Sequence, residues 1–351
     1  MDESIFTYLK ANGFRQPVME DDDFDYSPPW YKQLHLACKK IAEAVDSKYV
    51  VLQDFNFNAM AAYSPKFIAL RYGVFDLSCK LALVVTDFID NGTKCFTAES
   101  NGSPKTYKEL FELDATKYFE NNLFEEKLKS NSFRHRFELI SSIFTLFTMF
   151  HEAGHIYHSH GLRHNSLDID DFDNANRERL NEEDALNSQS RELVSDMFAL
   201  QGLVDNHLKE LKKFVDDSDL YKKVLCDYFT YLSLYFYFLS PKLSESDFKN
   251  SSHPPAPVRL HMVTATFFAD GQLGLNKEDK DFVLAESRSA MLLILDKLFN
   301  DKNAEDWLTS IPEKDIKSWY TKVRDRAISH WYLFGTDREL VEEIIYLQSV
   351  M

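Results

Sequence analysis

Residues 140–160 read Ile-Ser-Ser-Ile-Phe-Thr-Leu-Phe-Thr-Met-Phe-His-Glu-Ala-Gly-His-Ile-Tyr-His-Ser-His, and this stretch decides how the chain is interpreted. Its first half places apolar residues on almost every side of a helix, which is typical of a helix buried in a core. It leads directly into His151-Glu152-Ala153-Gly154-His155. We therefore expect one long helix over Phe133–His160 that carries ionisable side chains into the interior.

The spacing of the ionisable residues indicates a metal site. Residues four apart share one face of a helix, so His151 and His155 can bind one ion, and Glu152 is placed to take a proton from a metal-bound water. Zinc suits two neutral imidazoles and a carboxylate, and it leaves a fourth position open. The alternative is an accidental pattern, since three fixed positions recur by chance in unrelated helices. Buried ionisable groups nevertheless need partners, and a metal supplies them.

The third ligand is expected to be a glutamate. An extended three-histidine pattern requires Gly at position 158 and His at position 161, whereas this chain has His158 and Gly161. Arg191-Glu192-Leu193-Val194-Ser195-Asp196 instead offers a Glu and an Asp one helical turn apart. We expect Glu192 to bind the metal and Asp196 to accept the free N–H of a ligand histidine, with His151 the first choice. The alternative is a pair of solvated helix charges.

Other histidines follow the motif. His158 shares a helix face with His151 and could contact the site or a substrate, but a surface position is the reading we favour. His160 and His164 are expected to face solvent or to lie in a loop.

Ser252-His253-Pro254-Pro255-Ala256-Pro257-Val258-Arg259-Leu260 is the next unusual segment. Its prolines fix the backbone at the entrance to a helix and could hold His253 over a cleft. The alternative is an ordinary proline-rich loop.

The three segments, in this order, resemble gluzincin peptidases of the CAAX prenyl endopeptidase and HtpX type. They are also similar to soluble phage-exclusion peptidases of the Lit type. The residues that match are His151, Glu152, His155, Glu192, Asp196, His253, Pro254 and Arg259. The resemblance extends over a predicted strand pair and an apolar helix at residues 49–90 but covers little of either end of the chain.

The resemblance implies two further roles. His253 would stabilise the oxyanion of a tetrahedral intermediate, and Arg259 would anchor its segment or bind substrate. The chain departs from the membrane members because it has no predicted transmembrane span, so prenylated substrates are not expected. It departs from the phage-exclusion peptidases in its length and in a long polar insert at Gly161–Ser190.

Composition excludes several other classes. The formal net charge of −16 argues against nucleic-acid binding, which requires a basic surface. The apolar runs at residues 140–150 and 224–239 are short for a bilayer, so no membrane insertion is expected. The four cysteines include no C-x-x-C pair, and the first residues, Met1-Asp2-Glu3-Ser4, are acidic where an export signal would be basic. Together these features predict a cytoplasmic protein.

The predicted fold class is α+β and mostly helical: a zincin-like core with a small β-hairpin or sheet and the His151–His155 helix. Helical spacing is found at residues 33–47, 74–90, 191–204, 221–239 and 258–268, and strands are predicted at residues 49–57 and 67–72. The expected organisation is an irregular acidic lead-in at 1–30, a metallopeptidase core at 31–275, and a C-terminal helical part of the same domain at 276–351.

The leading functional hypothesis is a zinc-dependent endopeptidase that hydrolyses peptide bonds of an intracellular protein. A second hypothesis is that this peptidase is an effector of the phage-exclusion kind, whose activity is restrained until a trigger arrives. The restraint is suggested by the polar insert, which could lie over the cleft. A free edge of the early hairpin could pair with the substrate backbone. The alternative is a non-catalytic helical interaction protein in which zinc is structural or absent.

Overall fold

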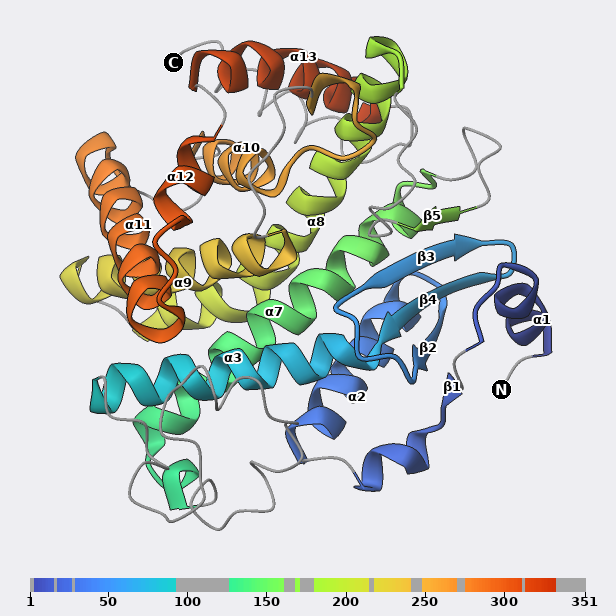
Figure 1. Cartoon of the computed structure of the whole chain (residues 1–351), viewed down its shortest axis with the longest axis horizontal. Coiled ribbons are helices and arrows are strands. Elements are labelled where there is room, and N and C mark those ends of the chain that lie inside the picture. The colour runs from blue at the N-terminus through green and yellow to red at the C-terminus, as the bar shows by residue number, and fades with distance from the viewer. Residues whose placement is uncertain are drawn as a thin grey trace. The chain divides into compact units, whose positions relative to one another are not determined.

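The structure is a computed structural model, drawn in Figure 1. It describes residues 3–15, 18–26, 29–92, 126–160, 168–170, 180–214, 218–240, 248–269, 275–310 and 313–332. Helices dominate these residues, with one small sheet, so the predicted α+β class is confirmed at this level. In the described part of the chain, no helix combines the length and the hydropathy needed to cross a membrane.

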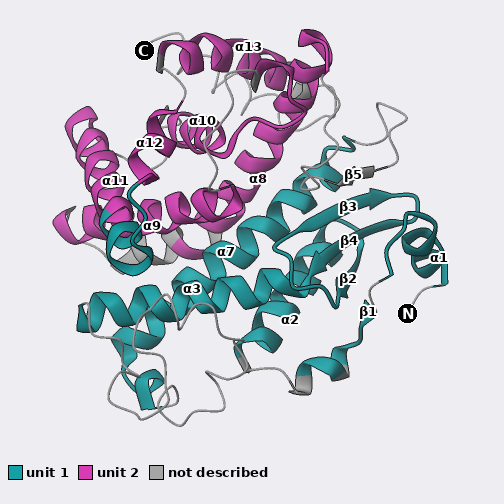
Figure 2. Ribbon diagram, in the orientation of Figure 1, with its two compact units in different colours: residues 1–172, 293–302 teal, residues 173–292, 303–351 magenta. Residues whose placement is uncertain are grey.

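The chain divides into two compact units, coloured separately in Figure 2. The first contains Met1–Phe172 and Leu293–Lys302, and the second contains Asp173–Leu292 and Asn303–Met351. The predicted organisation into a lead-in, a core and a C-terminal part of one domain remains a prediction. One difference concerns residues 1–30, where the structure has regular elements in place of an irregular lead-in: helix α1 (Glu3–Ala11), strand β1 (Val18–Met19) and the 3-10 helix η1 (Asp21–Tyr26).

A mixed five-stranded sheet lies in the first unit. Its order is β1-β2-β4-β3-β5, with β2 at Lys48–Leu52, β3 at Ala59–Tyr63, β4 at Lys66–Arg71 and β5 at Asp168–Asp170. Strands β2 and β4 are parallel, and the other pairs are antiparallel. The sequence predicted β2 and β4 but missed β3. It also extended β2 to Phe57, whereas the strand ends at Leu52.

Both faces of this sheet are covered. Side chains alternate between the faces of a strand, so Phe67 and Ala69 of β4 point to one face and Ile68 and Leu70 to the other. All four are at most 1% exposed. The first face packs against Ile5 and Leu9 of α1 in a single apolar cluster, which is the reason that α1 is ordered. Helices α2 (Pro29–Ala44) and α7 (Asn131–Tyr157) contact the sheet as well.

The connection from the sheet into α3 (Tyr72–Asn91) requires a glycine. Gly73 donates its backbone N–H to the carbonyl of Asp54 at 2.8 Å. A Cβ at this position would stand 2.3 Å from the carbonyl oxygen of Phe55. Glycine permits this close approach of two backbone segments. From here α3 runs along α7, and these two helices form the most extensive helix pair of the unit.

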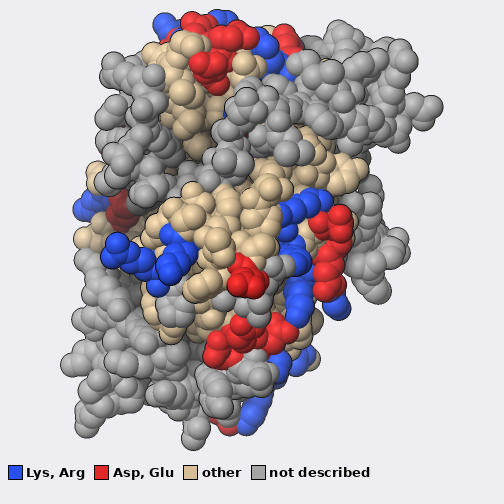
Figure 3. Space-filling model, turned by 90° about the vertical axis from the view of Figure 1, so that its right-hand side faces the viewer, with Lys and Arg blue, Asp and Glu red and all other residues tan. Residues whose placement is uncertain are grey.

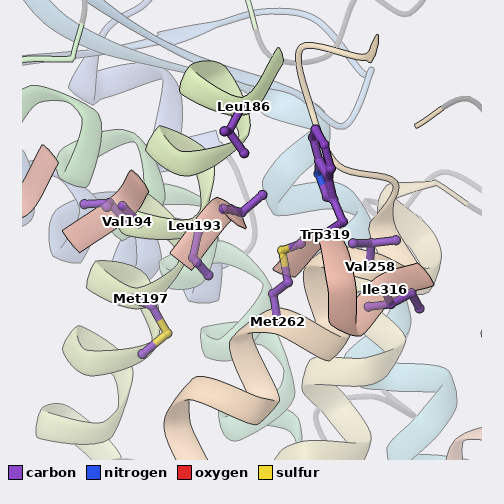
Figure 4. Close-up of a cluster of buried hydrophobic side chains, with 10 residues drawn as sticks. Leu186, Leu193, Val194, Met197, Val258, Met262, Ile316 and Trp319 are labelled. Atoms are coloured by element: carbon purple, nitrogen blue, oxygen red, sulfur yellow. The ribbon is translucent and has the colours of Figure 1, made fainter. Parts of the chain in front are cut away.

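The second unit is helical. Its elements are α8 (Glu182–Phe214), α9 (Ser218–Leu239), η4 (Phe248–Asn250), α10 (Ala256–Ala269), α11 (Lys277–Phe299, whose last turns belong to the first unit), α12 (Ala304–Thr309) and α13 (Glu313–Tyr332). Figure 4 shows the apolar cluster that joins α8, α10 and α13. It includes Trp319, which is only 1% exposed. The indole of Trp319 donates a hydrogen bond to Gln189 at 2.8 Å, which fixes α13 against α8.

Charge on the described surface is mixed in sign. On the face drawn in Figure 3, Lys and Arg side chains lie next to Asp and Glu side chains, with uncharged residues between them. Ion pairs join some of the charged residues of the structure, such as Lys39 and Asp21 at 2.6 Å.

Candidate metal centre

Helix α7 brings the motif into the interior of the first unit. From Ile143 to Met149 every side chain is at most 9% exposed, so this segment is buried on all sides as its composition predicts. Two ion pairs fix its first turns to α3: Arg136 with Asp90 at 2.6 Å, and Lys127, just before the helix, with Asp87 at 2.8 Å.

The two histidines of the motif face each other. His151 and His155 are 2% and 0% exposed, and their Nε2 atoms are 3.1 Å apart. The rings meet edge to face with centroids 4.7 Å apart. Glu152, between them in sequence, is 0% exposed. The prediction that His151 and His155 share one face of the helix therefore agrees with the structure.

A third histidine holds the opposite side of the His155 ring. The Nδ1 atom of His160 lies 3.0 Å from Nδ1 of His155. With the proton of His155 on Nδ1, this atom donates to His160 and the lone pair of Nε2 faces His151. Hydrogen bonds of this kind fix the tautomer and the orientation of metal-binding imidazoles.

The end of α7 explains how His160 reaches this position. Ser159 has φ of 54°, in the left-handed region. Its N–H donates to the carbonyl of Ile156, and the N–H of His160 donates to that of His155, both at 3.1 Å. These two bonds define a Schellman motif, which reverses the chain at a helix end. The reversal folds the His160 side chain back onto the last turn.

In the second unit, α8 presents a carboxylate pair to a buried arginine. Arg259, on α10, donates from Nε and Nη2 to the two oxygens of Asp196, at 2.9 and 2.6 Å. The same Nη2 lies 3.7 Å from Glu192 Oε2. These three side chains are at most 4% exposed. Burial alone would lower the pKa of Arg259, but the Asp196 carboxylate raises this pKa well above its ordinary value.

His253 lies beside the same glutamate. Its Nε2 is 3.5 Å from Glu192 Oε1, and its Nδ1 is 2.8 Å from the hydroxyl of Ser252. The segment is fixed to α8, because Gln189 donates to the carbonyl of Ser251 at 2.8 Å. The prolines that follow lead into α10, as the sequence predicts. Glu192 is therefore a neighbour of both His253 and Arg259, although the sequence separates it from each of them by more than 60 positions.

Three of these buried side chains could hold a metal ion. His151, His155 and Glu192 each offer one ligand atom, and these atoms lie within 4.8 Å of one another. Two imidazoles and a carboxylate form a donor set that suits several divalent transition metals. The residues therefore fit a metal ion by their chemistry and burial.

The structure corrects the histidine predictions at the end of α7. His158 was expected at the surface, and His160 was expected to face solvent or to lie in a loop. His160 does lie in the turn after α7, but both residues are only 1% exposed, and their rings stack with centroids 5.6 Å apart. The cause is the turn at Ser159, which a helical projection cannot reveal. His164 lies outside the described residues. The expected bond between Asp196 and His151 remains a prediction, and the pairing of Asp196 with Arg259 fits the anchoring role considered for Arg259.

Comparison with known proteins adds no relative. No protein-family model, no curated protein and no solved structure matches this chain.

Proposed function

We propose that this chain is a zinc-dependent endopeptidase of the gluzincin type, in which His151, His155 and Glu192 hold the metal. The observation that carries the proposal is the buried group formed by these three side chains, with Glu152 buried beside the two histidines. The order of the segments that contain them also resembles that of gluzincins.

The histidine geometry suits two ligands of one metal ion. Two imidazole nitrogens that share an ion must lie close together. The Nε2 atoms of His151 and His155 are 3.1 Å apart. When Nδ1 of His155 donates to His160, Nε2 of His155 remains as the ligand atom. A bound zinc ion would supply a Lewis acid that makes water nucleophilic near neutral pH.

The chain's own residues would then handle the protons and the negative charge. Glu152 accepts a proton from the attacking water and passes it to the leaving amine, which is general acid–base catalysis by a single carboxylate. His253 donates from Nε2 to the oxyanion, where one such donor contributes about 3–4 kcal/mol. Arg259, held by Asp196, helps to position Glu192, because its Nη2 lies 3.7 Å from Glu192 Oε2.

The test separates metal binding from catalysis. The purified wild-type protein should contain about one zinc per chain by elemental analysis, and Glu152→Gln should retain this zinc. Cellular proteomes are then compared after expression of each form. New peptide termini should arise with the wild type and be absent with Glu152→Gln. Equal cleavage by both forms would refute the role of Glu152.

The same measurements decide the non-catalytic alternative. Zinc present with no new termini from either form would favour a structural metal. Absence of zinc, together with a His155→Ala variant that behaves as the wild type, would favour a helical interaction protein without metal.

One observation favours a restrained form of the peptidase. The sequence suggested that an edge of a hairpin formed by residues 49–57 and 67–72 is free to pair with substrate. In the structure the unpredicted strand β3 pairs with β4 on one side and with β5 over Met60–Ala62 on the other. Strand β5 belongs to the polar insert. A substrate strand that used this edge would have to displace it. Deletion of Asp168–Asp170 should then raise basal cleavage, whereas unchanged or lower cleavage would count against restraint.

A further inference from the structure

A cavity lies in the helical unit, and none of His151, His155 and Glu192 lines it. Its volume is about 270 Å³. Two helix faces form its walls: Pro257, Leu260, His261, Thr264 and Ala265 of α10, and Leu284, Ser287, Arg288 and Met291 of α11. These positions follow the three-to-four-residue spacing of a helix face. Phe229 and Ser233 of α9 close one end, and Leu308 and Ile316 complete the lining.

The walls are mainly apolar, although three hydroxyl groups and the imidazole of His261 line them. Ser233 donates to the carbonyl of Phe229 and Thr264 to that of Leu260, each one turn back on its own helix. Ser287 donates to the carbonyls of Val283 and Cys226. A hydroxyl that is bonded in this way has its only proton committed, so it offers a ligand no donor. The interior therefore suits a hydrocarbon group.

The charge that Arg288 brings to the cavity is positive. Among the described residues that line it, none is acidic, although the whole chain carries a formal charge of −16. Arg288 contributes a guanidinium whose side chain is 47% exposed. Its ion pair with Glu305 is long, 3.7 Å, and Glu305 is 71% exposed, so solvent screens this pair. A ligand carboxylate could replace Glu305 and bind the guanidinium in a two-pronged geometry.

We propose that this cavity binds a small amphipathic carboxylate, with a hydrocarbon tail between α10 and α11 and the carboxylate on Arg288. The volume sets the length of the tail. It lies just below the range of about 300–1,000 Å³ that drug-sized ligands occupy, which favours a medium-length chain over a long lipid. Leu284, 39% exposed, marks the side on which the cavity opens to solvent.

Isothermal titration calorimetry with sodium octanoate tests the proposal on the full-length protein. Octylamine and octan-1-ol serve as probes with the same tail and a different head. Octanoate should bind with one site per chain, and the amine should not bind. Arg288→Gln should weaken octanoate about tenfold, as expected for one solvent-exposed charge-assisted contact. Ala265→Phe should abolish binding by filling the space for the tail.

A matched control and the contrary results make the test decisive. Arg324→Gln, at an arginine of α13 that does not line the cavity, should leave octanoate affinity unchanged. Thermal unfolding of each variant shows whether it is folded, and Arg288→Gln is the variant that carries the conclusion if Ala265→Phe unfolds. Absence of octanoate binding, equal binding of octylamine, or an affinity that Arg288→Gln leaves unaltered would overturn the proposal. Tighter binding of an acetylated dipeptide ending in a leucine carboxylate would also overturn it, in favour of a peptide terminus.

Discussion

Removal of the Asp196 carboxylate should be the most costly single change that the described ion pairs of the second unit allow. Asp196→Ala deletes both acceptors of the two-pronged bond from Arg259 and leaves the guanidinium in a site where it is 4% exposed. Loss of one partner of a buried ion pair costs about 3–5 kcal/mol. Glu192, 3.7 Å from the same Nη2, can move towards the arginine and recover part of this energy. We therefore expect a loss of about 3 kcal/mol in the free energy of unfolding.

A double-mutant cycle isolates the pair. Arg259→Met removes the charge and retains an apolar stem, and the combination with Asp196→Ala leaves neither charge behind. The double variant should be less destabilised than the sum of the two single variants, with a coupling energy of about 2 kcal/mol or more. Urea unfolding in the presence of a chelator measures these values without a contribution from bound metal.

A second readout tests the link to the metal. In Asp196→Ala the guanidinium is free to bind Glu192, so zinc affinity should fall by about 10–100-fold. As a control, Glu182→Ala breaks an exposed pair with Lys322 and should leave the unfolding midpoint unchanged. A cost below about 1 kcal/mol for Asp196→Ala, the value of an exposed pair, would refute the reasoning, and so would additive single-variant effects.

Three further changes probe the local geometry. His160→Ala should lower zinc affinity about 10–100-fold through the lost support of His155, measured by competition with a chromophoric chelator; unaltered affinity would contradict this role. Ser159→Gly should raise the free energy of unfolding by about 0.5–1 kcal/mol, because glycine adopts positive φ without strain, and a loss of stability would argue against the Schellman turn. Gly73→Ala should lower that energy by about 1–3 kcal/mol through its clash with the Phe55 carbonyl; a neutral result in urea unfolding would show that the two segments can separate.

Helical periodicity predicted most of the helices, and its failures have local causes. Helix α8 was expected to begin at Arg191 but begins at Glu182. The chain carries the start signal for this helix, since Asn181 accepts from the N–H of Asp184 at 2.9 Å and three acidic residues occupy the first turn. The polar composition of the insert concealed this cap. Strand β3 was missed because Ala-Met-Ala-Ala-Tyr has low strand propensity, and pairing with β4 and burial stabilise it instead.

In the candidate site, residue spacing predicts the contacts within one helix turn but not the contacts between distant segments. A fixed helix geometry places His151 and His155 on one face, so four residues of sequence suffice. No local rule relates Asp196 to Arg259, which are 63 positions apart. The family resemblance implied an anchoring role for Arg259 but did not name Asp196 as its partner. Neither helical spacing nor the family resemblance could predict the contact of His160 with His155, because this contact depends on the positive φ of Ser159.

Net charge is the physical reason to prefer a cation-binding site over a cluster of structural histidines. Asp196 and Arg259 neutralise each other through two short hydrogen bonds, so with Glu192 the three buried side chains carry one net negative charge. A net charge in the interior is costly unless a counter-charge lies close to it. Neutral histidines supply dipoles but no full charge, whereas a divalent cation would supply the missing charge. With the proton of His155 on Nδ1, facing His160, the lone pair of Nε2 would be available to the same cation. The charge of Glu192 and this tautomer of His155 would thus favour the same occupant, although they arise from different helices and different interactions.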